Sequence, residues 1–268
     1  MNFNVCTTFR KLYLCQLSET IPNMKIYSVS LILIFACVSL QTKAQDTLWK
    51  NEKLNTAKDC KYMEPQEREM IYELNRLRSD PPRYAKEFVK PMLDGALRNL
   101  KEYGKGDANY SLTTSYVNNK PSKVDTTWHY INEEEVKACQ TLYDSLLKMK
   151  PLSILLPDEG IYNACIKHAK DQGPTNNVNH QGRDGSWPWE RVTKYSPKMR
   201  TGNENIAYNS DADVRTIVLQ LLVDTGIPGY GHRYNTLNAE WTHVACYYTR
   251  PPVMKSKWWI QEYGAIEK

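Results

Sequence analysis

Common catalytic signatures are missing from this sequence of 268 residues. It contains no H-E-x-x-H motif of zinc proteases, no G-x-S-x-G nucleophile turn, no Walker loop and no dinucleotide-binding fingerprint. No block of lysine and arginine stands out, so neither nucleic acid nor an anionic membrane surface is indicated as a partner. These absences exclude the families that carry such signatures, but they do not exclude every hydrolase.

The C-x-x-C spacing of a structural zinc ribbon is also absent. Cys6, Cys15 and Cys37 fall within the first 44 residues, which have the features of a leader. The even number of cysteines that remains permits two disulfide bonds in an exported chain, in any of three pairings. We therefore expect disulfides among the others, in a pairing that the sequence leaves open: Cys60, Cys139, Cys165 and Cys246.

The first 44 residues resemble a leader for export. From Met24 the sequence runs through one lysine, an apolar stretch over residues 26–40 and a small-residue site that ends at Ala44. The apolar stretch is too short for a comfortable transmembrane helix. We expect a secretory signal peptide that is cleaved near Ala44–Gln45, and a mature protein that is secreted, periplasmic or at the cell surface.

The leader leaves one alternative open and changes the charge. Cys37 could instead receive a lipid and anchor the protein. Removal of residues 1–44 takes away four basic residues and one acidic residue, so the formal net charge falls from +5 to +2. The mature chain is therefore less basic than the full sequence suggests, and we expect no integral membrane span in it.

Apolar periodicity predicts helices along much of the mature chain. Residues 45–63 are polar and mixed, and we interpret them as an extended N-terminal arm. Between about residues 91 and 131, glycines and an Asn-Asn pair predict an insertion that is a long loop with little structure of its own. We expect helices that begin at Pro65, at the cap Asp80, at the capping box of Asn132 with Glu135, at Asp158, at Trp187 and at the capping box of Ser210 with Asp213.

The C-terminal part has β character. Two runs rich in Tyr, Trp, Val and Ile cover residues 244–249 and 258–263, and a brief strand-like run covers residues 204–208. Helices first and strands late indicate an α+β domain rather than a repeat of βαβ units. We expect a single domain over residues 64–268.

Three groups capable of metal binding or proton transfer lie in the same part of the chain. His180 lies in the run N-H-Q-G-R-D-G-S-W-P-W-E-R, Glu204 in G-N-E-N-I-A-Y, and His232 follows a glycine-proline loop. Neutral imidazoles and carboxylates hold a divalent metal or act as general acids and bases. Spacing alone leaves open whether the three side chains share one cleft or belong to unrelated loops.

Four segments resemble motifs of the CAP superfamily of cysteine-rich secretory proteins, antigen 5 and pathogenesis-related proteins, in its bacterial branch. Asn75 and Arg78 match the family's N-x-x-R opening. The stretch from His180 to Arg191 is similar to H-x-G-x-D-G-x-x-P-x-x-R, and residues 202–208 are similar to the G-E-N-hydrophobic-A segment. Residues 231–238 are similar to G-H-R-x-N-I-L-N.

The resemblance implies a three-layer α-β-α sandwich, with a small, twisted, mainly antiparallel sheet and a central cleft. It implies that His180 and His232 are the cleft histidines and that Glu204 is a cleft acid. No glutamate occupies the place of the family's second acid here. Asp224 is the nearest candidate for that place, and Glu190 competes with it.

Each candidate also has a structural interpretation. His180 and His232 would hold Zn²⁺ if carboxylates and water completed the coordination, or they would be hydrogen-bonded loop histidines. For Glu204 we expect support of an imidazole rather than catalysis. Other groups are expected to be structural: the Cys165–His168 pair, the Glu190–Arg191 pair that locks the turn at Trp187 and Trp189, and the tryptophan pairs 187/189 and 258/259, which could otherwise stack on sugars or sterols.

The sequence predicts an exported module that binds an extracytoplasmic ligand. The resemblance suggests a lipid, a sterol, a glycan or a protein, and the sequence does not choose among them. One alternative is a zinc-dependent, peptidase-like hydrolase in which His180 and His232 hold the metal and Glu204 takes the proton of a water. The other alternative is a non-catalytic structural module of the cell surface.

Overall fold

The computed structural model describes residues 6–10, 49, 51–117, 120–175, 179–209, 212–250 and 257–267. The chain divides into two compact units. The larger unit consists of residues 53–107 and 130–268, and the smaller contains residues 1–52 and 108–129. All five predicted site residues belong to the larger unit.

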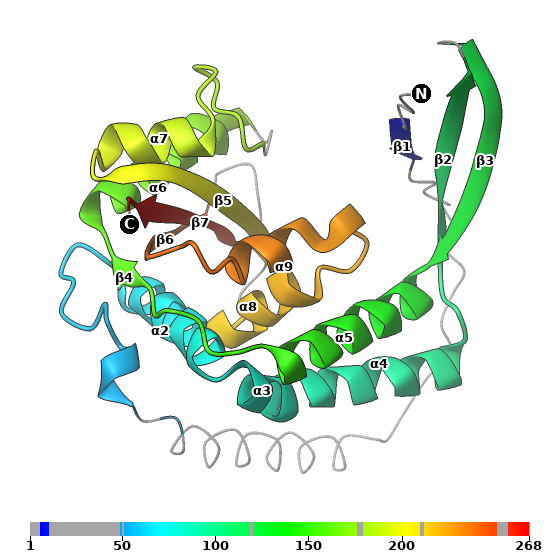
Figure 1. Ribbon diagram of the computed structural model, residues 1–268, viewed down its shortest axis with the longest axis horizontal. Helices are drawn as coiled ribbons and strands as arrows, with labels where there is room; N and C mark the ends of the chain where they lie inside the picture. Colours follow the sequence, from blue (N-terminus) through cyan, green and yellow to red (C-terminus); the bar gives the residue numbers. More distant parts are fainter. Residues whose placement is uncertain are drawn as a thin grey trace, which may run out of the picture. The chain divides into compact units, whose positions relative to one another are not determined.

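A four-stranded sheet forms the middle layer of the larger unit (Figure 1). Its strand order is β4–β6–β7–β5, with β4 at Leu156–Pro157, β5 at Met199–Asn209, β6 at His243–Thr249 and β7 at Lys257–Ile266. β7 pairs antiparallel with β5 and β6, whereas the short β4 pairs parallel with β6. The sheet is mainly antiparallel, as predicted, and β6 and β7 are the two expected C-terminal strands.

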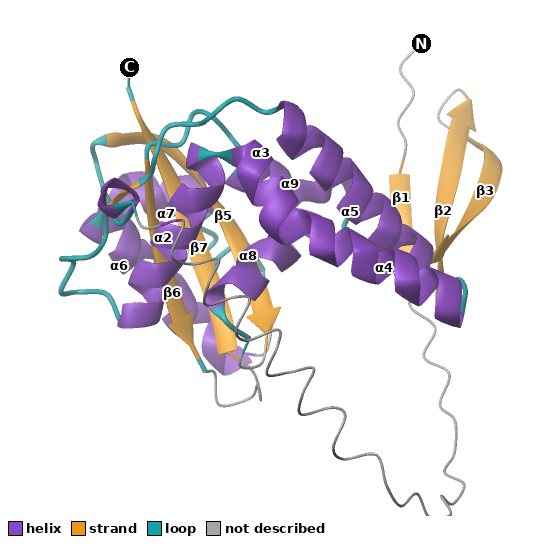
Figure 2. Ribbon diagram, turned by 90° about the horizontal axis from the view of Figure 1, so that it is seen from below, coloured by secondary structure: helices purple, strands orange, loops and turns teal. Residues whose placement is uncertain are grey.

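Helices cover both faces of this sheet (Figure 2). On one face lie α6 (Glu159–Gln172) and α7 (Pro188–Tyr195). On the other face lie α2 (Pro65–Ser79), α8 (Val214–Val223) and α9 (Gly231–Thr236). The predicted α+β fold, a three-layer α-β-α sandwich, is confirmed.

Alternation along β7 explains why both faces are covered. Its residues from Trp258 to Tyr263 are all almost completely buried. Glu262 contacts Arg191 of α7, whereas the opposite face carries Gln261, whose amide donates to the sulfur of Met70 in α2. Successive side chains of a strand point to opposite faces, so a strand with no exposed side requires a helical layer on each.

Asn75 and Arg78, the two residues of the N-x-x-R motif, bond α2 to loops that are distant in the sequence. The Asn75 amide nitrogen donates to the carbonyls of Leu54 and Leu155, each at 3.0 Å, and its oxygen accepts from the Leu155 N–H at 2.7 Å. Burial lowers the pKa of the Arg78 guanidinium to about 10. Its nitrogens donate to four backbone carbonyls, those of Ser153, Thr236, Asn238 and Trp241.

Two predictions about irregular segments were wrong. Residues 51–63 are not an extended arm: they contain the 3-10 helix η2 (Glu52–Leu54) and turns, and Leu54, Ala57 and Met63 are buried. The expected unstructured insertion at about 91–131 is regular throughout most of its length. It contains most of α4 (Lys90–Tyr103), β2 (Ala108–Val117) and β3 (Lys120–Tyr130), and α4 follows α3 (Pro81–Tyr84) and the π-helix η3 (Ala85–Val89).

Aspartates cap three of the helices. Asp80 caps α3 as predicted, and Asp158 caps α6 at the predicted start of that helix. Asp213, expected only as the partner of a cap at Ser210, is itself the residue that caps α8. Asn132 does not cap α5 (Ile131–Lys148), because this helix begins before it and the Asn132 amide donates to Gly104 instead. Ser210, the other half of a predicted capping box, lies outside the described residues.

The smaller unit contains a three-stranded sheet in the order β1–β2–β3. β1 (Cys6–Arg10) lies within the expected leader and pairs antiparallel with β2, and residues 11–48 lie outside the described residues. Tyr110 and Trp128 contact each other across β2 and β3, with ring centroids 5.5 Å apart. Among the helices that the structure describes, none has the length and apolar character needed to cross a bilayer.

The predicted disulfides were also wrong. Cys60, Cys139, Cys165 and Cys246 all carry free thiols. Cys139, Cys165 and Cys246 are fully buried, and the Cys165 thiol donates to the carbonyl of Ala245 at 3.6 Å. These three therefore act as small apolar core residues.

Candidate functional site

Glu204 lies at the centre of a buried cluster of polar side chains. It is paired directly with Glu262 in the antiparallel register of β5 and β7, and both carboxylates are buried between the sheet and α7. Gly202 lets α7 approach this closely, because a Cβ there would lie only 2.6 Å from the side chain of Val192 and 2.7 Å from the carbonyl oxygen of Tyr263. Two acids at adjacent positions of a sheet repel each other unless a cation or a proton intervenes.

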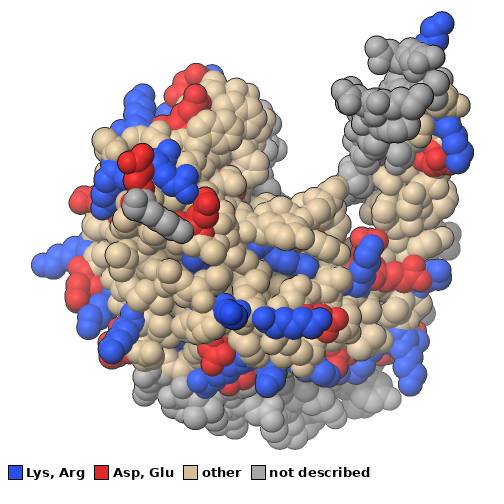
Figure 3. All heavy atoms as spheres, in the orientation of Figure 1, with Lys and Arg blue, Asp and Glu red and all other residues tan. Residues whose placement is uncertain are grey.

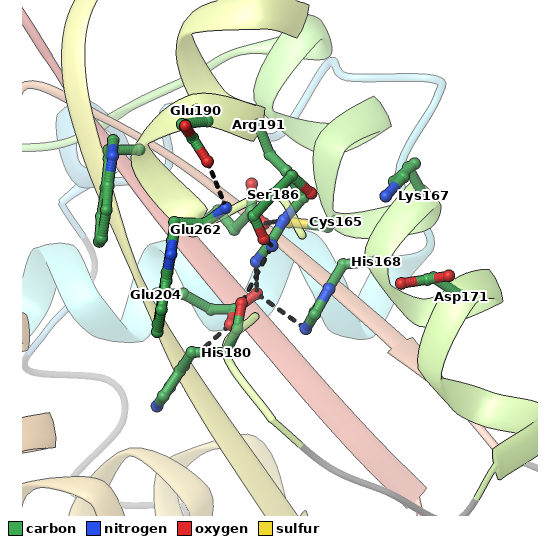
Figure 4. Close-up of polar contacts among 12 residues, drawn as sticks. Cys165, Lys167, His168, Asp171, His180, Ser186, Glu190, Arg191, Glu204 and Glu262 are labelled. Atoms are coloured by element: carbon green, nitrogen blue, oxygen red, sulfur yellow. Dashed lines mark hydrogen bonds and ion pairs between the residues drawn. The ribbon is translucent and has the colours of Figure 1, made fainter. Parts of the chain in front are cut away.

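Arg191 of α7 supplies that cation (Figure 4). Its Nη2 donates to Glu204 Oε2 at 2.9 Å, and its Nε donates to Glu262 Oε1 at 3.1 Å. Its Nη1 donates to the carbonyls of His180 and Ser186, at 3.0 and 2.9 Å. One fully buried guanidinium thus joins two strands to the loop that carries His180.

His180 forms a hydrogen bond with the other carboxylate oxygen of Glu204. Its Nδ1 lies 2.9 Å from Glu204 Oε1, and its side chain is 45% exposed. Burial and the nearby Arg191 charge lower the pKa of this imidazole, so the ring is neutral at pH 7. A neutral ring that donates from Nδ1 keeps Nε2 as an acceptor, and this nitrogen points away from Glu204 in Figure 4.

His168 of α6 lies on the remaining side of Glu204. Its Nε2 is 2.9 Å from the carbonyl oxygen of Asn179 and 3.6 Å from Glu204 Oε2. Burial lowers the pKa of His168 to about 3, and burial raises the pKa of the Cys165 thiol well above its usual value. The thiol donates to a carbonyl and stays protonated, so Cys165 and His168 are structural, as expected, and form no nucleophilic dyad.

The two acids hold a proton at neutral pH. Burial raises the pKa of Glu204 to about 7, although the Arg191 charge opposes this shift. Burial and the neighbouring Glu204 raise the pKa of Glu262 well above its ordinary value. Two buried carboxyl groups that share one guanidinium cannot both ionise easily, so the pair carries one proton near pH 7.

His232 forms a second carboxylate–histidine pair with Asp224. Asp224 is the left-handed residue, at φ +57°, that ends α8. Its Oδ1 lies 2.7 Å from His232 Nδ1, and its Oδ2 accepts from the His232 backbone N–H at 3.0 Å. The candidate second acid therefore orients His232, and Asp is long enough for this because the left-handed turn brings the two residues together.

Adjacent residues of β5 connect the two pairs. Glu204 faces α7 and binds His180, whereas the amide of Asn205 faces α9. The Asn205 amide nitrogen donates to the hydroxyl of Thr236 at 2.9 Å and to the carbonyl of His232 at 3.3 Å. The G-E-N segment thus supports one histidine from each face of the sheet.

A family model described as CAP, the cysteine-rich secretory protein family, matches residues 71–263. The chain belongs to this family. The structure of an outer surface protein from Borrelia burgdorferi is similar, with a TM-score of 0.36 and 16% identity over 49% of this chain and 94% of that one. An extracellular protein with an SCP domain from Bacillus anthracis has a TM-score of 0.33 and 15% identity over 61% of this chain and 65% of its own. No match was found among curated proteins.

Within this CAP domain, Glu190 has a different place from the one predicted. It is exposed, and its carboxylate accepts from the N–H of Trp187 at 2.8 Å. It therefore caps the start of α7 and does not pair with Arg191, which turns inward. The predicted pairing of Glu190 with Arg191 was wrong, although each side chain bonds to the turn at Trp187 as expected, Glu190 to the Trp187 N–H and Arg191 to the Ser186 carbonyl.

The donor set for zinc is incomplete in the described residues of the CAP domain. His180 and His232 each keep Nε2 for a ligand, and a carboxylate at Nδ1 is the usual support of a metal-binding histidine. However, no group of three or more His, Cys, Asp or Glu side chains is placed to hold a metal ion in this part of the chain. These described residues do not fit a resident zinc, so the zinc site expected from the sequence is not supported.

A polar groove of about 360 Å³ lies beside the cluster, between α6 and α7. The side chain of Arg191 separates the groove from the buried acids. Its other walls come from α6, from the loop before α7 and from α7 itself, namely from Lys167, Asp184, Gly185, Ser186, Glu190, Lys194 and Tyr195. The predicted cleft that joins both histidines stays a prediction.

Proposed function

We propose that this CAP protein is an exported binding module that contacts its ligand through the surface around His180. Three observations support this proposal: the leader-like first 44 residues, the family of the domain, and the state of Glu204. The last of these carries the most weight. Both oxygens of Glu204 are engaged, one by His180 and the other by Arg191.

The engagement of Glu204 favours binding over catalysis. A general base must be within hydrogen-bonding reach of the proton that it removes. The carboxylate is buried, and its hydrogen bonds hold a ring and a guanidinium in place. Glu204 therefore positions His180, whose half-exposed, neutral ring offers an acceptor nitrogen to a ligand.

The ligand classes to test are those expected for the family: a lipid, a sterol, a glycan or a protein. Suitable probes are phosphatidylcholine vesicles with and without cholesterol, insoluble chitin and cellulose, and fluorescent casein. Co-sedimentation measures binding to the vesicles and polysaccharides, and release of fluorescence from casein measures peptidase activity. The proteins to compare are the native chain, His180→Ala and, as a surface control, Arg200→Ala.

We expect saturable binding to one probe class, about tenfold weaker in His180→Ala and unchanged in Arg200→Ala, without turnover of casein. Casein cleavage that His180→Ala abolishes would replace the binding proposal with the hydrolase. If no probe bound more weakly to His180→Ala than to the native chain, the proposed role of this surface would be overturned. Binding to no probe at all would favour the structural-module alternative.

A further inference from the structure

The two tryptophan pairs of this protein have opposite surroundings. Trp258 and Trp259 are at most 1% exposed and form part of the core, as expected. Trp187 and Trp189 are 38% and 46% exposed, against the expectation of core packing. Their rings are stacked with centroids 5.3 Å apart and an angle of 4° between their planes. The start of α7 thus presents two large, parallel aromatic surfaces to solvent.

This aromatic stack adjoins the polar groove between α6 and α7. Ser186, which precedes Trp187, and Glu190, which follows Trp189, both line the groove. The carboxylate of Glu190 accepts from the Trp187 N–H, and the capped turn therefore holds the first tryptophan and the groove wall in one rigid piece. A groove of about 360 Å³ lies within the usual range for small-molecule sites.

The walls of the groove offer both donors and acceptors. Lys167 forms an ion pair with Asp184 at 2.5 Å. Lys194 and Glu190, two side chains of opposite charge on α7, also line the groove. Figure 3 shows charged groups of both signs over this end of the larger unit. A lipid or sterol offers few groups that can bond to such polar walls, whereas a sugar hydroxyl both donates and accepts a hydrogen bond.

We propose that the tryptophan stack of Trp187 and Trp189, with the adjoining groove, is a carbohydrate-binding site. Sugar rings stack their C–H faces on the indoles, and their hydroxyls bond to Glu190, Asp184 and the two lysines of the groove. Tyr195, also in the groove wall and 38% exposed, supplies a further ring. The site takes a short glycan of neutral or N-acetylated sugars, because Lys167 and Lys194 balance Asp184 and Glu190 in the groove, and Arg191 is paired with the buried acids.

This inference rests on the proposed role of the protein as a binding module, but it assigns a different surface. The side chain of His180 pairs with Glu204, whereas the rings of Trp187 and Trp189 stack on each other. The variant His180→Ala therefore tests the proposed function, and the double variant Trp187→Ala/Trp189→Ala tests this inference. Either can fail without the other.

Isothermal titration of the purified protein with cellotetraose and with chitotetraose tests the site. We expect saturable one-to-one binding of at least one tetrasaccharide. The double variant Trp187→Ala/Trp189→Ala should bind about tenfold more weakly or not at all, because stacking supplies much of the contact. Tyr103→Ala, which removes another exposed ring on α4, should bind like the native protein.

Groove variants guard against a folding defect in the tryptophan double variant. Lys194→Ala and Asp184→Asn change exposed groove residues and should each weaken sugar binding severalfold, with an unchanged circular dichroism spectrum. No heat of binding with either sugar would overturn the inference. So would equal affinity for the native protein and for the folded tryptophan variant, or an equal loss in Tyr103→Ala.

Discussion

Glu204 lies directly opposite Glu262 across β5 and β7, and one guanidinium, that of Arg191, bonds to both. The cluster has two acids but only one permanent cation, so a proton on one of the acids balances the remaining negative charge. His180 is oriented by the same carboxylate that Arg191 neutralises. The geometry of the proposed binding surface therefore depends on a buried ion cluster.

Replacement of Arg191 by alanine should lower the free energy of unfolding by about 3–5 kcal/mol. The change leaves two buried carboxyl groups without their cation and two loop carbonyls without a donor. Urea unfolding near pH 7 measures the effect. The control is Arg200→Ala, which removes an exposed ion pair with Glu240 and should cost at most about 1 kcal/mol. Similar losses in both variants would contradict the assigned role of Arg191.

Stability should fall as the pH rises above about 6.5. The pKa of Glu204 rises from 4.5 to about 7 on folding, so its stabilising contribution is complete below pH 4.5 and is lost as the pH rises through 7. His168 has the opposite sign, because its pKa falls from 6.5 to about 3 and its contribution is lost as the pH falls below 6.5. Between pH 4.5 and 6.5 the contributions of Glu204 and His168 to the free energy of unfolding change in opposite directions. Above pH 6.5 only the contribution of the buried acids still changes with pH.

The variant Glu262→Gln separates these contributions. An amide needs no proton to lie beside Glu204, so Arg191 can neutralise the single remaining carboxylate. We expect urea unfolding between about pH 6.5 and 8 to show a smaller decline in this variant than in the native protein. An equally steep decline would mean that other groups cause it.

Zinc titration tests the metal prediction directly. Because the described residues form no three-ligand group, we expect no tight one-to-one binding of Zn²⁺ by metal-stripped residues 45–268 near pH 7.5. Isothermal titration measures this, with the His180→Ala/His232→Ala double variant as the control. Tight binding that disappears in the double variant and weakens at about pH 5.5 would instead confirm the histidine site.

Replacement of Arg78 by lysine should destabilise the protein by about 2–4 kcal/mol. Lysine keeps the charge but cannot reach four carbonyls in a fixed plane, and an unpaired buried acceptor costs about 1–3 kcal/mol. Denaturant unfolding measures the loss. Arg200→Lys, a matched change in an exposed ion pair, should be close to neutral. A neutral Arg78→Lys would show that water satisfies these carbonyls.

Thiol counting tests the absence of disulfides. In residues 45–268 all four thiols should react with Ellman's reagent after denaturation, because none is paired. In the native protein only the half-buried Cys60 should react quickly, since the other three are enclosed. Fewer than four thiols in the denatured, unreduced protein would mean that a disulfide forms.

The sequence predicted some helices and strands of the fold correctly and missed others. Aspartate caps, apolar stripes and strand composition are local signals, so α2, α6, α8, β6 and β7 were found. The hairpin of β2 and β3 was missed, although Thr, Tyr and Val on both sides of Asn118-Asn119 are typical of paired strands. The two glycines just before the hairpin, Gly104 and Gly106, suggested a loop, so this strand pattern was not recognised.

The core of the cluster was missed for a physical reason. Glu262 belongs to no motif, and only the strand register places it beside Glu204. Its signal was an acid on the same side of β7 as Trp258 and Ile260, where a buried charge requires a partner. Arg191 was visible as the last residue of a family motif, but the sequence did not show that it turns inward whereas its neighbour Glu190 faces solvent.

The four carbonyls that Arg78 binds lie 75 to 163 residues away from it along the chain. Such contacts close only after most of the chain has been synthesised, since long loops must be brought together first. A nascent chain that ends before Thr236 contains only one of the four acceptors, the carbonyl of Ser153, and so leaves most of this buried guanidinium without partners. We therefore expect the domain to acquire its stable form only when its last strands have emerged from the ribosome.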